Sequence, residues 1–174
     1  DNLVFKTLYE LGKMNSNINI EDLGYFIGPI INSSGRLSNS NLAANLLISE
    51  NKNVIKNSCI KLIELNNKRK EIENKILNDI NFEKISKENK DVIIYYSPNI
   101  NEGLIGIIAS RLKDYFNKPA IVITNSKRFL KGSARSTTNY SIGNVIKKLI
   151  DYRLIESGGG HNMAAGFTLK NDNL

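Results

Sequence analysis

The spacing of apolar residues changes once along this sequence, in a charged and polar segment at residues 81–90. Before that segment, apolar residues recur at the period of an amphipathic helix. The longest such pattern predicts a single helix from Asn53 to Ile80, with polar Asn66 and Arg69 on the same stripe. Its apolar positions are Ile55, Cys59, Leu62, Leu65, Ile72 and Ile76. We expect this stripe to be covered by a domain outside the chain or by the chain's own sheet, with polar partners for Asn66 and Arg69.

After residue 90, short apolar strands alternate with helices. Strands are expected at residues 91–97, 120–124, 129–136 and 166–169, and helices at 102–116 and 142–150, the second helix capped by Ser141. A glycine-rich turn is expected at residues 158–160. This alternation is typical of an α/β sheet. We therefore predict an α/β protein, with a helical portion and long connector helix at residues 1–85 and a compact mixed-sheet α/β domain at residues 86–174.

Two shorter helices are expected before the connector helix. The first runs from Leu3 to Leu11 and is closed by Gly12, and the second runs through Leu42–Leu47 after N-cap candidates at Ser38–Ser40. Between them, residues 24–37 read GYFIGPIINSSGRL. Because this segment has three glycines and a proline, it is expected to be a loop.

The chain carries an excess of positive charge. It has 24 Lys and Arg against 17 Asp and Glu, a formal net charge of +7. A positive balance favours an anionic partner, most commonly nucleic acid. The basic residues are scattered along the chain, however, so a general compositional bias explains the excess equally well.

Composition and chain ends favour a cytoplasmic protein. The longest apolar runs, such as Ile105–Ala109, are too short to cross a bilayer, and no leader for secretion opens the sequence. Cys59 is the only cysteine, which excludes a disulfide framework and a cysteine-rich zinc site. Because residue 1 is Asp and not Met, we expect the chain to be a fragment of a longer protein.

The sequence contains no complete active site of a familiar kind. It has one histidine and neither an Asp-x-Asp nor a His-x-Glu element, so we expect no metal ligands in this chain. A Gly-x-Ser-x-Gly element that could supply a nucleophile for His161 is also missing.

Three segments rich in glycine, small polar residues and arginine could bind phosphate. In residues 32–37, Arg36 comes just before an expected helix, whose first amides could join it around a phosphate. In residues 131–136, Ser133 and Arg135 alternate with Ala134 and so project from one face of a strand. In residues 158–166, three glycines precede His161. Taken singly, a capped turn, a solvated edge strand and a structural histidine explain these segments as well.

Taken together and in this order, these segments resemble the RecJ-type single-stranded-DNA-specific exonucleases of the DHH phosphoesterase superfamily. The resemblance covers nearly the whole chain, and KGSARS and GGGHNMAAGFTL are its most specific motifs. The matching segments are GPIINSSGRL (28–37), residues 66–69, EGLIGIIASRL (102–112), KGSARS (131–136) and GGGHNMAAGFTL (158–169).

The resemblance implies that metal binding and substrate binding belong to different domains. In such enzymes an N-terminal DHH domain holds Mn²⁺ or Mg²⁺, and a long helix joins it to a DHH-associated domain that grips the substrate. This chain resembles the helix and the associated domain, without the metal domain and without the usual downstream oligonucleotide-binding-fold domain. By the family pattern, Arg36, Ser133 and Arg135 bind a 5′ phosphate and His161 lies near the scissile phosphate. Ser136, Gly159 and Gly160 are further expected substrate-binding residues.

One position departs from the family pattern. The family usually has His before the Glu-Gly of the EGLIG motif, whereas this chain has Asn101. Asparagine can donate a hydrogen bond to a phosphate oxygen but cannot transfer a proton. Activity would be weakened if this catalytic position does acid–base work, and little would be lost if it only positions the substrate or neighbouring loops. We favour the positioning role.

The resemblance favours one function among three. The first is the substrate-binding part of a 5′→3′ exonuclease for single-stranded DNA in repair and recombination. The second is a relative that cleaves short oligoribonucleotides or cyclic dinucleotides, and the third is a nucleic-acid-binding module without chemistry. The GRL segment and the long helix favour the exonuclease, whereas the missing metal ligands favour the binding module for this chain alone.

Overall fold

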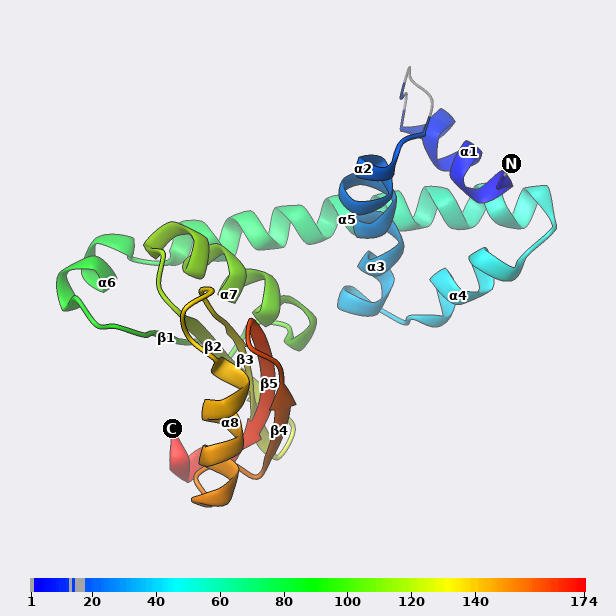
Figure 1. Cartoon of the computed structure of the whole chain (residues 1–174). Helices are drawn as coiled ribbons and strands as arrows, with labels where there is room; N and C mark the ends of the chain where they lie inside the picture. Colours follow the sequence, from blue (N-terminus) through cyan, green and yellow to red (C-terminus); the bar gives the residue numbers. More distant parts are fainter. Residues whose placement is uncertain (1, 13, 15–17) are drawn as a thin grey trace. The chain divides into compact units, whose positions relative to one another are not determined.

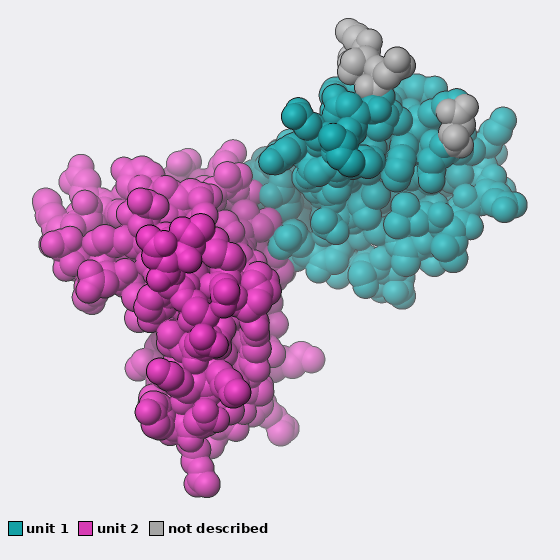
Figure 2. Space-filling view, viewed as in Figure 1, with its two compact units in different colours: residues 1–72 teal, residues 73–174 magenta. Residues whose placement is uncertain are grey.

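The computed structural model describes residues 2–12, 14 and 18–174 (Figure 1). By their internal contacts, the residues fall into two compact units, unit 1 at Asp1–Ile72 and unit 2 at Glu73–Leu174 (Figure 2). The division lies inside one long helix, whereas the predicted domain boundary lies at residues 85 and 86. Among the described residues, no helix combines the length and apolar character that crossing a membrane would require.

Unit 1 is built from helices. They are α1 (Leu3–Leu11), α2 (Ile20–Asp22), a π-helical turn (Leu23–Ile27), α3 (Gly28–Leu37), α4 (Asn41–Ile48) and the first part of α5 (Lys52–Asp79). The long helix predicted at residues 53–80 is thus confirmed. The Asn2 side chain caps α1 by accepting hydrogen bonds from the Val4 and Phe5 amides, and Gly12 ends that helix as predicted.

Residues 24–37 are helical, so the predicted loop is wrong. Pro29 lies in the first turn of α3, directly after the π-helical turn. Ser33 is buried, and its hydroxyl donates to the Ile30 and Leu62 carbonyls at 2.6 and 3.1 Å. Burial of Ile27 and Ile30 on the same helix face outweighs the low helix propensity of the glycines. Arg36 consequently lies in the last turn of α3. The helix expected after residues 38–40 is confirmed as α4, which begins at Asn41 with Ser40 at its N-cap.

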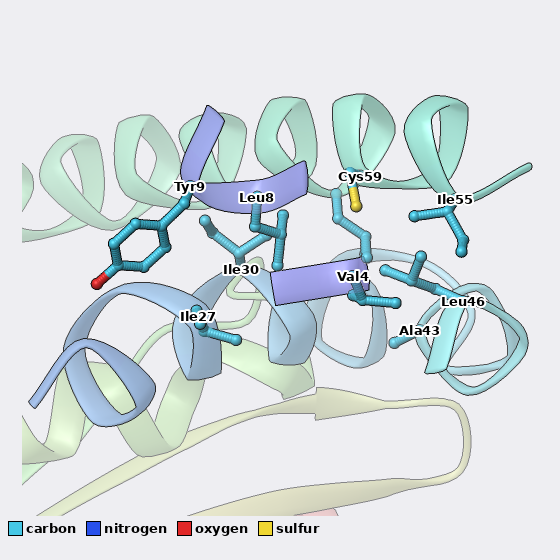
Figure 3. Close-up of a cluster of buried hydrophobic side chains, with 10 residues drawn as sticks. Val4, Leu8, Tyr9, Ile27, Ile30, Ala43, Leu46, Ile55 and Cys59 are labelled. Atoms are coloured by element: carbon cyan, nitrogen blue, oxygen red, sulfur yellow. The ribbon is translucent and has the colours of Figure 1, made fainter. Parts of the chain in front are cut away.

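The core of unit 1 covers the apolar stripe of α5. Ile55, Cys59 and Leu62 are at most 1% exposed. They pack in one cluster with Val4, Leu8, Tyr9, Ile27, Ile30, Ala43 and Leu46 from α1, α3, α4 and the π-helical turn (Figure 3). The expectation that a separate domain or the sheet covers this part of the stripe is therefore wrong, because the chain's own N-terminal helices do so. Burial raises the pKa of the Cys59 thiol to about 11.

Unit 2 is a mixed sheet with helices on both faces. Its strands are β1 (Ile93–Tyr96), β2 (Ala120–Ser126), β3 (Phe129–Arg135), β4 (Ser157–Gly160) and β5 (Ala164–Leu169), in the order β1-β2-β3-β5-β4. β1 and β2 are parallel, and the other neighbours are antiparallel. Its helices are the end of α5, α6 (Phe82–Glu88), α7 (Glu102–Phe116), α8 (Ile142–Asp151) and a 3-10 turn (Asn171–Asn173). The predicted fold class is confirmed.

The two sheet faces are covered by different helices. Leu130 and Ala134 of β3 belong to a core cluster with Ile142 and Ile146 of α8. The residues that alternate with them, Ser133 among them, point to the opposite face, which α7 covers over β2 and β3. Residues 158–160 form strand β4, so the turn predicted there is wrong, and the last strand begins at Ala164, two residues before its predicted start.

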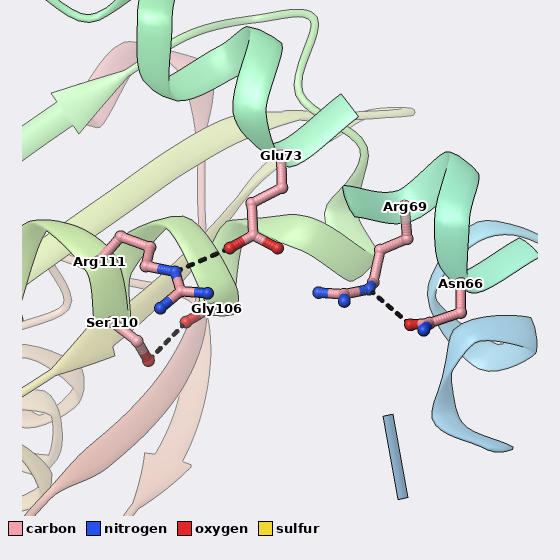
Figure 4. A network of polar contacts seen from close by, with 6 residues as sticks. All are labelled: Asn66, Arg69, Glu73, Gly106, Ser110 and Arg111. Atoms are coloured by element: carbon pink, nitrogen blue, oxygen red, sulfur yellow. Dashed lines mark hydrogen bonds and ion pairs between the residues drawn. The ribbon is translucent and has the colours of Figure 1, made fainter. Parts of the chain in front are cut away.

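Polar contacts accompany the second half of α5 (Figure 4). Arg69 Nε donates to Asn66 Oδ1 at 3.2 Å, so the buried Asn66 has a partner on its own helix. Within unit 2, Arg111 Nε of α7 donates to Glu73 Oε1 at 2.7 Å. Because the Glu73 side chain is only 5% exposed, this ion pair neutralises a buried charge and joins the end of α5 to α7.

Candidate functional site

Ser133 and Arg135 form the centre of the site on β3. Both side chains are half-buried on the face that α7 covers. Arg135 Nη1 donates to Ser133 Oγ at 3.1 Å and to the Ala134 carbonyl at 2.8 Å, which fixes the guanidinium along its own strand. A hydroxyl beside an oriented guanidinium is a suitable arrangement for binding a phosphate oxygen. The structure thus brings together two of the residues predicted to bind phosphate.

Gly106 of α7 makes room for this pair, and the sequence did not identify its role. A Cβ atom at this position would lie 2.8 Å from Arg135 Nη2 and 3.2 Å from Ser133 Oγ. Any side chain there would displace the guanidinium or push the helix away from the sheet. The signal that could have revealed Gly106 is a glycine inside an otherwise regular helical pattern, which often marks a close approach.

Ser136, a predicted substrate-binding residue, is used inside the protein. Its side chain is 1% exposed, and its hydroxyl donates to the Tyr140 carbonyl at 2.6 Å. Its amide donates to the Met163 carbonyl at 2.9 Å. Ser136 therefore holds the loop after β3 against the β4–β5 connection.

His161 lies in that β4–β5 connection and is exposed. Its Nδ1 accepts a hydrogen bond from the Met163 amide at 3.4 Å. The Gly143 amide at the start of α8 donates to the His161 carbonyl at 3.1 Å, and Ser141 Oγ donates to Asn162 Oδ1 at 2.8 Å. These contacts fix the backbone that carries the imidazole.

Asn101 caps α7 and lies away from His161. Its side chain accepts from the Gly103 amide at 2.8 Å, and Thr124 Oγ1 donates to the neighbouring Ile100 carbonyl at 2.7 Å. Thr124 pairs with Lys131 in the sheet, whereas His161 bonds to Ala164, which pairs with Arg135. Lys131 and Arg135 are about 13 Å apart along β3. The two predicted catalytic residues thus belong to opposite ends of the strands.

Gly159 and Gly160 are adjacent but differ in their surroundings. A Cβ atom at Gly160 would lie 2.4 Å from the Ala164 carbonyl oxygen, so packing against β5 requires glycine there. A Cβ atom at Gly159 would meet nothing within 4 Å. Gly160 is therefore explained by the fold, whereas Gly159 leaves open space on the sheet surface.

Arg36 belongs to unit 1, and the other predicted site residues belong to unit 2. Its side chain is half-buried at the end of α3. Its convergence with Ser133 and Arg135 on one phosphate stays a prediction.

The described residues do not form a metal centre. Nowhere in residues 2–12, 14 and 18–174 do three or more His, Cys, Asp or Glu side chains gather in a way that could hold an ion. The arrangement on β3 can bind and orient an anion, but it offers no ligand set for a catalytic metal.

Comparison with known proteins identifies the domain that carries this arrangement. The family model for the DHHA1 domain matches residues 89–174. Residues 89–174 are a DHHA1 domain. With the exception of Arg36, every residue predicted for the site lies within this DHHA1 domain.

Over most of its length, the chain is homologous to the RecJ single-stranded-DNA-specific exonucleases. It is 33% identical over 172 residues to that of Haemophilus influenzae, covering 91% of the chain and 30% of the relative. It is 32% identical to that of Bacillus subtilis, with 90% and 20% covered, and 30% identical to that of Escherichia coli, with 96% and 30% covered. The chain thus spans less than a third of these relatives.

Solved structures show the same fold. The crystal structure of RecJ from Thermus thermophilus in complex with Mn²⁺ matches with a TM-score of 0.83 at 23% identity, covering 99% of this chain and 25% of that one. A crystal structure of exonuclease RecJ bound to manganese matches with a TM-score of 0.76 at 23% identity, covering 98% of this chain and 42% of that one. The order of helices and strands in this chain therefore also occurs in solved structures.

Proposed function

We propose that this chain is the substrate-binding portion of a cytoplasmic 5′→3′ exonuclease that hydrolyses single-stranded DNA during repair and recombination. The homology to RecJ exonucleases over most of the chain supports this function, and the net charge of +7 suits a polyanionic substrate. Single-stranded DNA would be bound mainly through its phosphates, which fix register without reading sequence.

The main observation in support of the proposal is the Ser133–Arg135 pair of β3, which lies against Gly106 of α7. The pair presents a hydroxyl and a guanidinium from one strand, held in place by a hydrogen bond of 3.1 Å. In the proposed function these groups bind the 5′-terminal phosphate, and Arg36 of unit 1 supplies a further positive charge. Gly159 borders the bound DNA, and Gly160 and Ser136 hold the strands and loop around it.

In this proposal, part of the chemistry of hydrolysis comes from outside the described residues. Because these residues include no metal-binding group of side chains, we place the expected Mn²⁺ or Mg²⁺ in a DHH domain outside them. Such ions activate water and stabilise the charge that develops on phosphate. An oligonucleotide-binding-fold domain is a further proposed part of the intact enzyme. This chain contributes phosphate binding and an imidazole, His161, near the scissile phosphate, and Asn101 holds the start of α7.

The isolated chain should bind single-stranded DNA weakly and should not cleave it, with or without Mn²⁺. Binding through phosphates releases counterions, so Kd should rise with salt concentration. A plot of log Kd against log salt concentration should be linear, and its slope should increase by about 0.7 for each phosphate contact. Fluorescence anisotropy with a 5′-phosphorylated oligodeoxynucleotide, repeated across a salt series, measures both affinity and slope.

Two results would contradict this expectation. Metal-dependent cleavage by the 174-residue chain alone would show that the chemistry had been placed in the wrong part of the enzyme. Tighter binding of short oligoribonucleotides or cyclic dinucleotides than of single-stranded DNA would favour the second function considered for this superfamily. A 5′-hydroxyl oligonucleotide of the same sequence is the control for end recognition.

In an enzyme that joins this chain to a DHH domain, His161→Ala should lower the rate of cleavage while end binding stays nearly unchanged. The imidazole is exposed, and within the chain its Nδ1 accepts a hydrogen bond from the Met163 amide. Its removal should therefore change the fold little. Loss of a group that assists proton transfer costs about 10²- to 10⁴-fold in rate. Single-turnover kinetics give the rate, and His161→Gln is the control that keeps a polar side chain. An unchanged rate would place His161 outside the chemistry.

A further inference from the structure

A cavity of about 360 Å³ lies beside the Ser133–Arg135 pair, on the same sheet face. α7 covers this face over β2 and β3, and the cavity opens where β5 and β4 continue the sheet. Its floor includes Gly166 and Gly159, and Ile105 of α7 forms an apolar side. Its polar lining consists of Glu102, Lys131, Ser157 and Thr168. The volume is within the range of small-molecule sites, about 300–1,000 Å³.

Strand register shows how the cavity adjoins the phosphate site. Ser133 pairs with Gly166, and Gly166 pairs with Gly159, so the floor starts directly beside the Ser133 side chain. The next row on the same face runs from Lys131 through Thr168 to Ser157. Lys131 Nζ donates to Thr168 Oγ1 at 2.9 Å, which holds the ammonium group along the edge of this floor.

Packing within the chain does not explain the glycines of the floor. A Cβ atom at Gly159 would meet nothing within 4 Å, and one at Gly166 would meet only the Gly132 carbonyl oxygen at 3.8 Å. No glycine among the described residues has a positive φ, so the backbone does not require glycine at these positions either. By contrast, a Cβ atom at the neighbouring Gly158 would lie 2.9 Å from the Gly166 carbonyl oxygen. The space above Gly159 and Gly166 is left for something outside the chain.

The lining indicates which chemical class fits this space. Lys131 donates hydrogen bonds, Glu102 accepts them, and the Ser157 and Thr168 hydroxyls do both. The Glu102 carboxylate in the lining disfavours a second phosphate, because like charges repel. A planar heterocycle with polar edges suits this lining. Its flat face would lie on the floor without side chains, and its polar edges would meet the rim of donors and acceptors beside the apolar side.

We propose that this cavity holds the base and sugar of the 5′-terminal nucleotide whose phosphate is bound by Ser133 and Arg135. The inference rests on the proposed function, since it needs a phosphate on that pair. Because every base has a flat face, such a pocket accepts all four bases with modest preference.

Filling the floor tests the proposal without unfolding the protein. Gly166→Val places a branched side chain in open space on a strand, where it should keep or raise stability. The unmodified chain should bind a 5′-phosphorylated oligonucleotide about tenfold more tightly than one whose 5′-terminal nucleotide lacks its base. Gly166→Val should abolish that preference and retain the preference for a 5′ phosphate over a 5′ hydroxyl. Gly166→Ala should give a smaller loss, and Ser126→Val, at the far end of β2, should change neither preference.

The outcomes separate this inference from the proposed function. If the unmodified chain prefers a 5′ phosphate but binds abasic and normal ends equally, the nucleoside pocket is wrong and the phosphate site stands. The same holds if Gly166→Val keeps the full preference for a base. If the chain does not prefer a 5′ phosphate, both proposals are overturned.

Discussion

Gly160→Ala should destabilise unit 2 by about 3 kcal/mol, the upper part of the range for overpacking a tight site. The new Cβ atom would lie 2.4 Å from the Ala164 carbonyl oxygen and 2.5 Å from Ala165 Cα. Two of the atoms it meets are backbone, so a rotamer change cannot relieve the contact and the β4–β5 pairing must shift. Urea unfolding followed by far-ultraviolet circular dichroism measures the change in free energy of unfolding.

The adjacent glycine provides the matched control. Gly159→Ala makes the same chemical change on the same strand, but its Cβ atom meets nothing within 4 Å. It should leave the free energy of unfolding unchanged or raise it by about 0.4–1 kcal/mol, because alanine restricts the unfolded chain. Equal destabilisation by the two substitutions would show that strand pairing does not exclude a side chain at Gly160.

Arg135→Ala should remove most of the preference for a 5′-phosphorylated end. A hydrogen bond to a charged group contributes about 1.5–3 kcal/mol, equivalent to about 10- to 150-fold in affinity. The side chain is half-buried and bonds within its own strand, so the fold should lose much less than binding does. Anisotropy titrations with 5′-phosphate and 5′-hydroxyl oligonucleotides of one sequence measure the preference, and urea unfolding measures stability.

Two further variants separate geometry from charge. Arg135→Lys keeps the positive charge but loses the planar fork, so it should retain only part of the preference. Lys148→Ala removes one positive charge from an exposed position on α8 and should leave the preference intact. Equal binding of the two ends by the unmodified chain would contradict the phosphate site itself.

Local patterns in the sequence correctly predicted those helices and strands whose conformation does not depend on packing against distant segments. The helix predicted at residues 53–80 is α5, at Lys52–Asp79. A long run of apolar residues at the helical period fits no other secondary structure. The strand predicted at 129–136 is β3, and strict alternation alone places Ser133 and Arg135 on one face. The motif residues of the DHHA1 domain were likewise recognisable without coordinates.

Tertiary packing reversed the interpretation of the glycine-rich segments. Gly28 and Gly35 suggested a loop, yet burial of Ile30 and the bond from Ser33 to the Leu62 carbonyl hold that segment in a helix. Residues 158–160 suggested a turn, yet they form an edge strand. Glycine has no Cβ, so the same residue suits a turn, a close strand pair or open floor, and only its neighbours decide which.

The composition of the site also depended on topology. Sequence alone determined that Ser133 and Arg135 lie on one strand face and that His161 follows a glycine run. Only the tertiary structure decided that Gly106 of α7 lies against the guanidinium, that Ser136 is buried, and that Asn101 and His161 belong to different ends of the strands. The reason is physical: alternation and helical period are set within a few residues, whereas the order β3-β5-β4 and the placement of α7 depend on contacts between distant segments.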